Sequence, residues 1–101
     1  MTGSKTSAMF VTLEGGEGAG KSTSRDFIVS MLKEYDVPFI QTREPGGTPI
    51  GEALRELLLS KEGTAPSVTT ELLMVFAARA QHLHEVIEPA LRDGKWVLCD
   101  R

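Results

Sequence analysis

The chain has 101 residues, of which 41% are hydrophobic and 25% are charged, and its formal net charge is −3. A length of this order gives one domain, or part of one, with a modest core. The mild acidity argues against nonspecific nucleic-acid binding, which needs a basic surface, and no apolar stretch approaches membrane-spanning length.

Residues 1–8 are mostly small and polar, and we expect them to form a disordered leader without the apolar core of a signal peptide. The single cysteine, Cys99, excludes an internal disulfide, which suits a reducing compartment. Because Cys99 lies in an apolar run, it is predicted to be an inert core residue. We therefore expect a cytoplasmic protein without a nucleic-acid or membrane partner, folded over residues 9–101.

The first predicted strand covers residues 9–14, and residues 15–22 follow it as Gly-Gly-Glu-Gly-Ala-Gly-Lys-Ser. This is the G-x-x-x-x-G-K-[ST] phosphate loop, placed between a strand and a helix predicted over residues 22–35. Its glycines let backbone N–H groups approach an anion closely, and the positive end of the helix adds to them. Lys21 can reach the β- and γ-phosphates, and the Ser22 hydroxyl can hold Mg²⁺. The motif predicts a site for a nucleoside triphosphate.

Residues 37–42 predict a second strand, and residues 43–49, Arg-Glu-Pro-Gly-Gly-Thr-Pro, predict a loop. A helix is expected over residues 50–59, with Pro49 at or near its first turn. Its predicted buried side carries Ile50, Leu54, Leu57 and Leu58.

A long helical pattern runs over about residues 68–92. Its apolar stripe consists of Leu72, Phe76, Ala80, Leu83, Ile87 and Leu91. Pro89 removes a backbone donor, so a kink or break is expected there, and Gly94 ends the segment as a C-cap would. Residues 95–99 predict a third strand that leads into Asp100 and Arg101.

Alternating strands and helices predict a doubly wound α/β fold, a parallel sheet of the P-loop NTPase kind with helices on both faces. Ligands in such sheets bind beyond the carboxyl ends of the strands. The loop after Glu14, the loop after Thr42 and the pair Asp100–Arg101 should therefore surround one site. Because three strands are few for such a sheet, we expect the chain to be the amino-terminal part of a longer protein.

Three charged residues near this site admit two interpretations each. Asp100 can hold Mg²⁺ beside Ser22, as a Walker B acid does, or can be a solvated aspartate. Arg101 can clamp a phosphoryl group or form a surface ion pair. Glu17, an anion within an anion-binding loop, either accepts a hydrogen bond from a second substrate or faces solvent.

Phe76 and Arg79 share a helical face, where a ring and a guanidinium can stack on a base and bind its edge. Periodicity alone favours Phe76 in the core and Arg79 as a surface charge. His82 and His84 have no carboxylate or cysteine at metal-ligand spacing, so no metal is assigned to them. Glu85, three residues after His82, indicates an ordinary helix-surface pair.

Four segments resemble bacterial thymidylate kinases in order and spacing: residues 10–23, 42–49, 71–81 and 100–101. The phosphate loop is common to many families. The combination of Arg-Glu-Pro-Gly-Gly with Phe-Ala-Ala-Arg is specific to far fewer families. That family transfers the γ-phosphoryl group of ATP to dTMP, giving dTDP and ADP. The resemblance implies a P-loop nucleoside monophosphate kinase domain over residues 9–101, with ATP, Mg²⁺, dTMP and a homodimer.

The resemblance also implies a role for each matching residue. Lys21, which neutralises the transferred group, is catalytic together with Arg101 and Glu17. The residues that hold the ATP phosphates are Gly15, Gly16, Glu17, Gly18, Ala19, Gly20, Lys21, Ser22 and Thr23. Ser22 and Asp100 hold the metal. The acceptor contacts are Glu17 beside the 3′-hydroxyl, Glu44 near phosphate and metal, Arg55 and Arg101 on the monophosphate, Arg79 at the thymine edge and Phe76 in the base pocket.

The sequence departs from many family members at two positions. Their stacking aromatic lies four residues before the arginine, here Val75, whereas Phe76 lies three before, so either can face the base. Gly18 stands where some members carry a loop arginine, which implies a lid arginine beyond residue 101.

Three alternatives to a thymidylate kinase are considered. Another nucleotide kinase would share the phosphate loop, and a truncated phosphate-binding or oligomerising fragment would be inactive. A GTPase would need an Asn-Lys-x-Asp sequence, which does not occur in these residues. We expect weak or no kinase activity from residues 1–101 alone.

Overall fold

The computed structural model describes residues 8–15, 20–63 and 65–101. Its elements are, in chain order, β1 (Phe10–Leu13), α1 (Lys21–Glu34), β2 (Phe39–Arg43), α2 (Pro49–Leu59), α3 (Val68–His82), the π-helical segment η2 (Leu83–Ile87), α4 (Glu88–Arg92) and β3 (Trp96–Asp100). The expected disordered leader lies outside the described residues except for Ala8, as do Gly16, Glu17, Gly18 and Ala19 of the phosphate loop.

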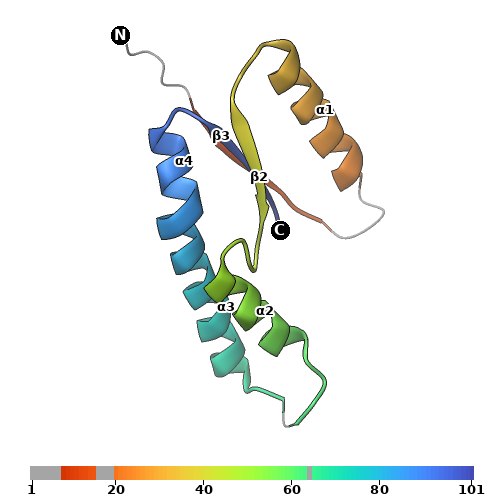
Figure 1. Cartoon of the computed structure of the whole chain (residues 1–101). Coiled ribbons are helices and arrows are strands. Elements are labelled where there is room, and N and C mark those ends of the chain that lie inside the picture. The colour runs from red at the N-terminus through yellow and green to blue at the C-terminus, as the bar shows by residue number, and fades with distance from the viewer. Residues whose placement is uncertain (1–7, 16–19, 64) are drawn as a thin grey trace.

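The three strands form a parallel sheet in the order β1-β3-β2. The central strand β3 is the most buried element, with Val97 and Cys99 0% exposed and Leu98 2% exposed. Figure 1 shows α1 on one side of the sheet and the rod of α3, η2 and α4 on the other. The doubly wound α/β class predicted from the sequence is confirmed, with helices on both faces.

The long helical pattern forms one continuous rod from residue 68 to residue 92, with a π-helical segment in place of a break. At the end of that segment the Glu88 N–H bonds to the Leu83 carbonyl, five residues back. Pro89 has no N–H, and its ring would collide with the carbonyl four residues earlier in a regular α-helix. A wider π turn just before the proline relieves that collision. Gly94, at φ 79°, follows the end of the rod as predicted.

Burial along the rod differs between its two halves. The carboxyl-terminal half packs on the sheet, where Ile87, Ala90 and Val97 form the core. In the amino-terminal half Leu72 and Phe76 are 54% and 53% exposed, so the predicted stripe is buried only in part. This half packs mainly against α2 and extends past the carboxyl ends of the strands (Figure 1).

The buried side predicted for the second helix is wrong at two positions. Ile50 and Leu57 are 54% and 60% exposed, because α2 packs mainly against α3 and lies beside the end of the sheet instead of on its face. Within the described residues, no helix combines the length and the apolar character needed to cross a bilayer.

Candidate functional site

The carboxyl ends of all three strands meet at one edge of the sheet. The backbone N–H of Arg101 donates to the Leu13 carbonyl at 2.9 Å, and that of Glu44 donates to the Asp100 carbonyl at 2.8 Å. These bonds join the segments after β1, β2 and β3. The convergence predicted from the fold class is therefore confirmed for the described residues.

The described ends of the phosphate loop have the backbone that glycine permits. Gly15 and Gly20 have φ angles of 120° and 80°, and Gly20 is the N-cap of α1. Left-handed backbone of this kind disfavours a residue with a Cβ. The four loop residues between them, Glu17 included, lie outside the described residues.

Lys21 begins α1 and its ammonium contacts the end of β3. Its Nζ lies 2.7 Å from Oδ1 of Asp100, and the two side chains are 23% and 39% exposed. The lysine of the phosphate loop and the predicted Walker B acid therefore lie side by side, although 79 residues separate them in the chain.

The predicted metal ligands offer suitable donors. Ser22 and Thr23 are exposed in the first turn of α1, next to Lys21. The Ser22 hydroxyl and the partly exposed carboxylate of Asp100 both supply oxygen, the donor that Mg²⁺ prefers. The chemistry of this donor set fits Mg²⁺.

The loop between β2 and α2 is fastened by one carboxylate. Glu52, in the first turn of α2, accepts hydrogen bonds from Arg43 Nε at 3.2 Å, Arg43 NH2 at 2.6 Å and the Gly47 N–H at 2.9 Å. The hydrogen bond from Arg43, followed by that from Gly47, lowers the pKa of Glu52 to about 2. The same hydrogen bond and charge raise the pKa of Arg43. One acid thus holds the strand end, the loop and the helix together.

The start of α2 follows its sequence signals. The Thr48 hydroxyl caps the helix by accepting from the Gly51 N–H at 2.8 Å, and Pro49 occupies the first turn as predicted. One turn further, Arg55 donates from NH1 to the Pro45 carbonyl at 3.2 Å. The structure therefore places Arg55 against the same loop that carries Glu44.

Glu44 is the centre of a buried charge network. Its side chain is 7% exposed, and its Oε1 accepts from Arg79 Nε at 2.8 Å, with Arg101 Nε 3.8 Å away. Its other oxygen, Oε2, lies 3.0 Å from His82 Nδ1. Arg101 also donates from NH1 to Glu14 Oε2 at 3.3 Å. Three of the residues predicted to contact the acceptor therefore form one cluster: Glu44, Arg79 and Arg101.

The pKa of Glu44 is lowered although its side chain is buried. Burial is the largest influence and opposes ionisation, but hydrogen bonds and charges from His82 and Arg79 together outweigh it. A buried carboxylate needs such partners to stay charged. Glu44 is thus an ionised acceptor with a fixed orientation.

His82 was not predicted to belong to the site, and its expected pairing with Glu85 is wrong. The ring is 0% exposed and lies between Glu44 and Thr42, whose Oγ1 is 2.6 Å from Nε2. Glu85 instead accepts from Gln81 Nε2 at 2.9 Å. The carboxylate partner of His82 lies 38 residues away in sequence, so local spacing could not reveal it.

Glu44, His82 and Cys99 bring three potential metal-ligand atoms within 4.8 Å of one another. Two observations favour a hydrogen-bonded network over a metal centre here. Two guanidinium groups already face the carboxylate of Glu44. Burial, followed by the charge of Glu44, raises the pKa of the Cys99 thiol to about 12, so Cys99 is a protonated thiol within this network. As predicted, Cys99 is a buried core residue.

Phe76 and Arg79 occupy α3 beside this network. Phe76 is 53% exposed, so the core position that periodicity favoured for it is wrong. The side chain of Arg79 is 33% exposed and bonded to Glu44, so it is not a free surface charge either. Both side chains keep surface available for a ligand.

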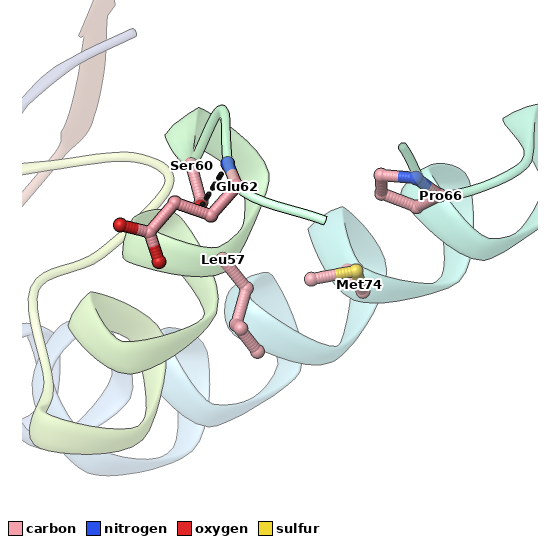
Figure 2. A pocket seen from close by; sticks show the side chains of 5 residues that line it. All are labelled: Leu57, Ser60, Glu62, Pro66 and Met74. Carbon is pink, nitrogen blue, oxygen red and sulfur yellow. Dashed lines mark hydrogen bonds between the residues drawn. The ribbon is translucent and has the colours of Figure 1, made fainter. Parts of the chain in front are cut away.

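A separate pocket of about 250 Å³ lies where α2 ends and α3 begins. Figure 2 shows its lining, Leu57, Ser60, Glu62, Pro66 and Met74. None of the described site residues is among them. This pocket lies at the carboxyl-terminal end of α2, whereas Glu44 precedes the amino-terminal end of that helix, so it is not the site that the motifs indicate.

Most of the chain matches known proteins in sequence. The sequence model of the family described as thymidylate kinase matches residues 13–101. A curated thymidylate kinase of Pseudomonas entomophila (strain L48) is 59% identical over 95 residues, which is 94% of this chain and 45% of that protein. One from Methylococcus capsulatus is 57% identical, with 95% and 45% covered.

A solved structure agrees with the sequence comparisons. The thymidylate kinase of Ehrlichia chaffeensis superimposes with a TM-score of 0.76 at 38% identity, covering 93% of this chain and 51% of that one. The chain therefore spans about half the length of the relatives it matches.

Proposed function

Since the chain belongs to the thymidylate kinase family, we propose that the whole protein transfers the γ-phosphoryl group of ATP to dTMP, giving dTDP and ADP. One observation supports this most strongly: Glu44 joins Arg79 and Arg101 at the sheet edge where Lys21 meets Asp100. This supports the proposal, because the groups that we assign to the acceptor lie at the same sheet edge as the groups that we assign to the donor. Phosphoryl transfer requires this juxtaposition, because it depends on positioning and charge neutralisation more than on covalent chemistry.

On the donor side, we propose that residues 15–23 hold the phosphates of ATP and that Glu17 contacts the 3′-hydroxyl side of the acceptor sugar. Lys21 leaves Asp100 and contacts the transferred group, whose charge grows in the transition state. Ser22 and Asp100 hold Mg²⁺, which neutralises phosphate charge when it is bound. Once Lys21 has left, the carboxylate of Asp100 lacks a cation, and Mg²⁺ supplies one.

On the acceptor side, Arg101 and Arg55 bind the monophosphate of dTMP, since a guanidinium fork matches phosphate oxygens. Arg79 binds the thymine edge, and Phe76 or Val75 covers the ring. Glu44 holds Arg79 and Arg101 in the orientation that they need.

We also propose that the whole protein is a cytoplasmic homodimer. The exposed apolar side chains of α2 and α3 support a protein partner at this surface: Leu57, Leu59, Val68, Leu72 and Leu73. Exposed apolar side chains gathered on neighbouring helices are typical of an interface.

The direct test is ADP formation by the whole protein with ATP, Mg²⁺ and one acceptor at a time: dTMP, dUMP, dCMP or AMP. We expect turnover with dTMP to exceed that with dCMP and AMP, because only thymine and uracil present the same edge to Arg79. ADP formation that ignores dTMP would contradict the proposal. Residues 1–101 alone serve as the comparison and are expected to show weak or no turnover.

A further inference from the structure

The ring of His82 is held from both nitrogens although it touches no solvent. Nε2 lies 2.6 Å from Thr42 Oγ1, and Nδ1 lies 3.0 Å from Glu44 Oε2. An ionised carboxylate can only accept, so Nδ1 carries the proton toward Glu44. In the neutral ring Nε2 then accepts the hydrogen bond of the Thr42 hydroxyl. For the neutral ring, the network thus fixes one tautomer of His82.

The two oxygens of Glu44 divide their partners between them. Oε2 faces His82, while Oε1 faces Arg79 at 2.8 Å and Arg101 at 3.8 Å. A carboxylate is planar, so fixing Oε2 also fixes the direction in which Oε1 is presented. Arg79 and His82 lie three residues apart on one face of α3, and Glu44 lies across from both.

The loop between β2 and α2 covers the His82 ring through Gly47. A Cβ at Gly47 would lie 2.5 Å from His82 Nε2 and 2.8 Å from Thr42 Oγ1, so the backbone itself covers the imidazole. Full burial and this close cover leave the ring no room for a second orientation. The histidine, the loop and the carboxylate therefore behave as one rigid unit.

We propose that His82 is a positioning residue, which through Glu44 holds Arg79 and Arg101 in the orientation that binds the acceptor nucleotide. This inference rests on the proposed function. His82 does not contact the acceptor. Its effect passes through a carboxylate whose second oxygen orients both arginines.

The test compares three variants of the whole protein. His82→Leu fills the cavity but removes both hydrogen bonds, whereas His82→Asn keeps an N–H donor at the position of Nδ1. Thr42→Val is the matched control, because it removes the hydrogen bond on the far side of the same ring. KM for dTMP, KM for ATP, kcat and the melting midpoint are measured for each.

We expect His82→Leu to raise KM for dTMP roughly tenfold or more, the scale of a lost hydrogen bond to a charged group. KM for ATP should stay within about twofold, since His82 does not contact the donor side. His82→Asn should recover most of the loss, and Thr42→Val should change KM for dTMP less than His82→Leu. A lowered melting midpoint with an unchanged KM for dTMP in His82→Leu would overturn the inference, as would an Asn variant no better than Leu.

A second measurement needs no turnover. Arg79 donates its Nε–H group to Glu44, and NMR measures the rate at which this proton exchanges with water. Faster exchange in His82→Leu than in His82→Asn supports the inference, and equal exchange in the two overturns it. If the unsubstituted protein fails to phosphorylate dTMP, the proposed function fails while this readout still decides whether His82 positions Arg79.

Discussion

Lys21 Nζ and Asp100 Oδ1 lie 2.7 Å apart, so the first residue of α1 and the last residue of β3 share one ion pair. Both side chains retain contact with solvent, which makes the pair easy to separate. An anionic ligand can compete for the lysine, and a cation can compete for the aspartate. An ion pair of this kind would open under the proposed function, in which Lys21 contacts a phosphate and Asp100 holds a metal ion.

The first prediction concerns Lys21. Lys21→Met keeps most of the length of the side chain and removes its charge, so we expect kcat of the whole protein to fall by roughly 100-fold or more. Lys33→Met, on the exposed last turn of the same helix, is the matched control and should leave kcat unchanged. Steady-state kinetics with ATP and dTMP measure both. Equal kcat values for the two variants would argue against a role of Lys21 in phosphoryl transfer.

The second prediction concerns the fork of Arg101. Arg101→Lys keeps the charge but loses the two-pronged geometry, so kcat/KM for dTMP should fall by about 10- to 100-fold. Arg92→Lys, at the exposed end of α4, provides the same exchange away from the site and should have no effect. If Arg101→Lys keeps kcat/KM within threefold, Arg101 supplies only charge at long range.

The third prediction concerns the close packing of Gly47 on His82. An alanine there suffers the cost of left-handed backbone, ~1–2 kcal/mol, and an overpacking cost of ~1–3 kcal/mol against the ring. Gly63 also has a positive φ, 72°, but a Cβ there meets nothing within 4 Å. Gly63→Ala should therefore lose only the first cost. Urea unfolding midpoints compare the two variants, and a Gly47→Ala no less stable than Gly63→Ala would contradict the packing argument.

The fourth prediction concerns pH and Glu52, whose folded pKa is about 2 against an ordinary 4.5. A carboxyl with a depressed folded pKa adds stability above its unfolded pKa and loses it as pH falls through the folded value. The contribution of Glu52 is therefore complete above about pH 4.5 and disappears toward pH 2. The melting temperatures of the unsubstituted protein and Glu52→Gln should thus converge over that interval.

The control for that titration is Glu56→Gln, an exposed acid on the same helix. Its melting temperature should run parallel to that of the unsubstituted protein over the same pH range. A gap between the unsubstituted protein and Glu52→Gln that persists unchanged to pH 2 would show that Glu52 does not titrate as proposed.

Local sequence signals predicted the strands, the helices and the sheet edge where Lys21, Asp100 and Arg101 meet. Periodicity, glycines and prolines act over a few residues, so they locate elements well. They failed where burial depends on partners far away in the chain. Ile50 and Phe76 have apolar spacing typical of a core, yet α2 and the amino-terminal half of the rod extend beyond the sheet and leave both exposed.

The network around His82 was missed for a related reason. Its partners, Thr42 and Glu44, lie about 40 residues earlier, and only the packing of α3 on the end of β2 brings them near. The sequence did contain a signal for this network. Arg79 and His82 lie three residues apart on one helix, and Glu44 has no charged partner at helical spacing, so one carboxylate shared by both could have been predicted.

The strand order β1-β3-β2 has a consequence for synthesis of the protein. Neither β1 nor β2 has a ladder neighbour among the described strands until residues 96–100 emerge from the ribosome and insert between them. The sheet edge that carries Lys21 and Asp100 is therefore assembled only once β3 is in place, by contacts that span almost 90 residues, and its formation should be slow compared with that of the helices.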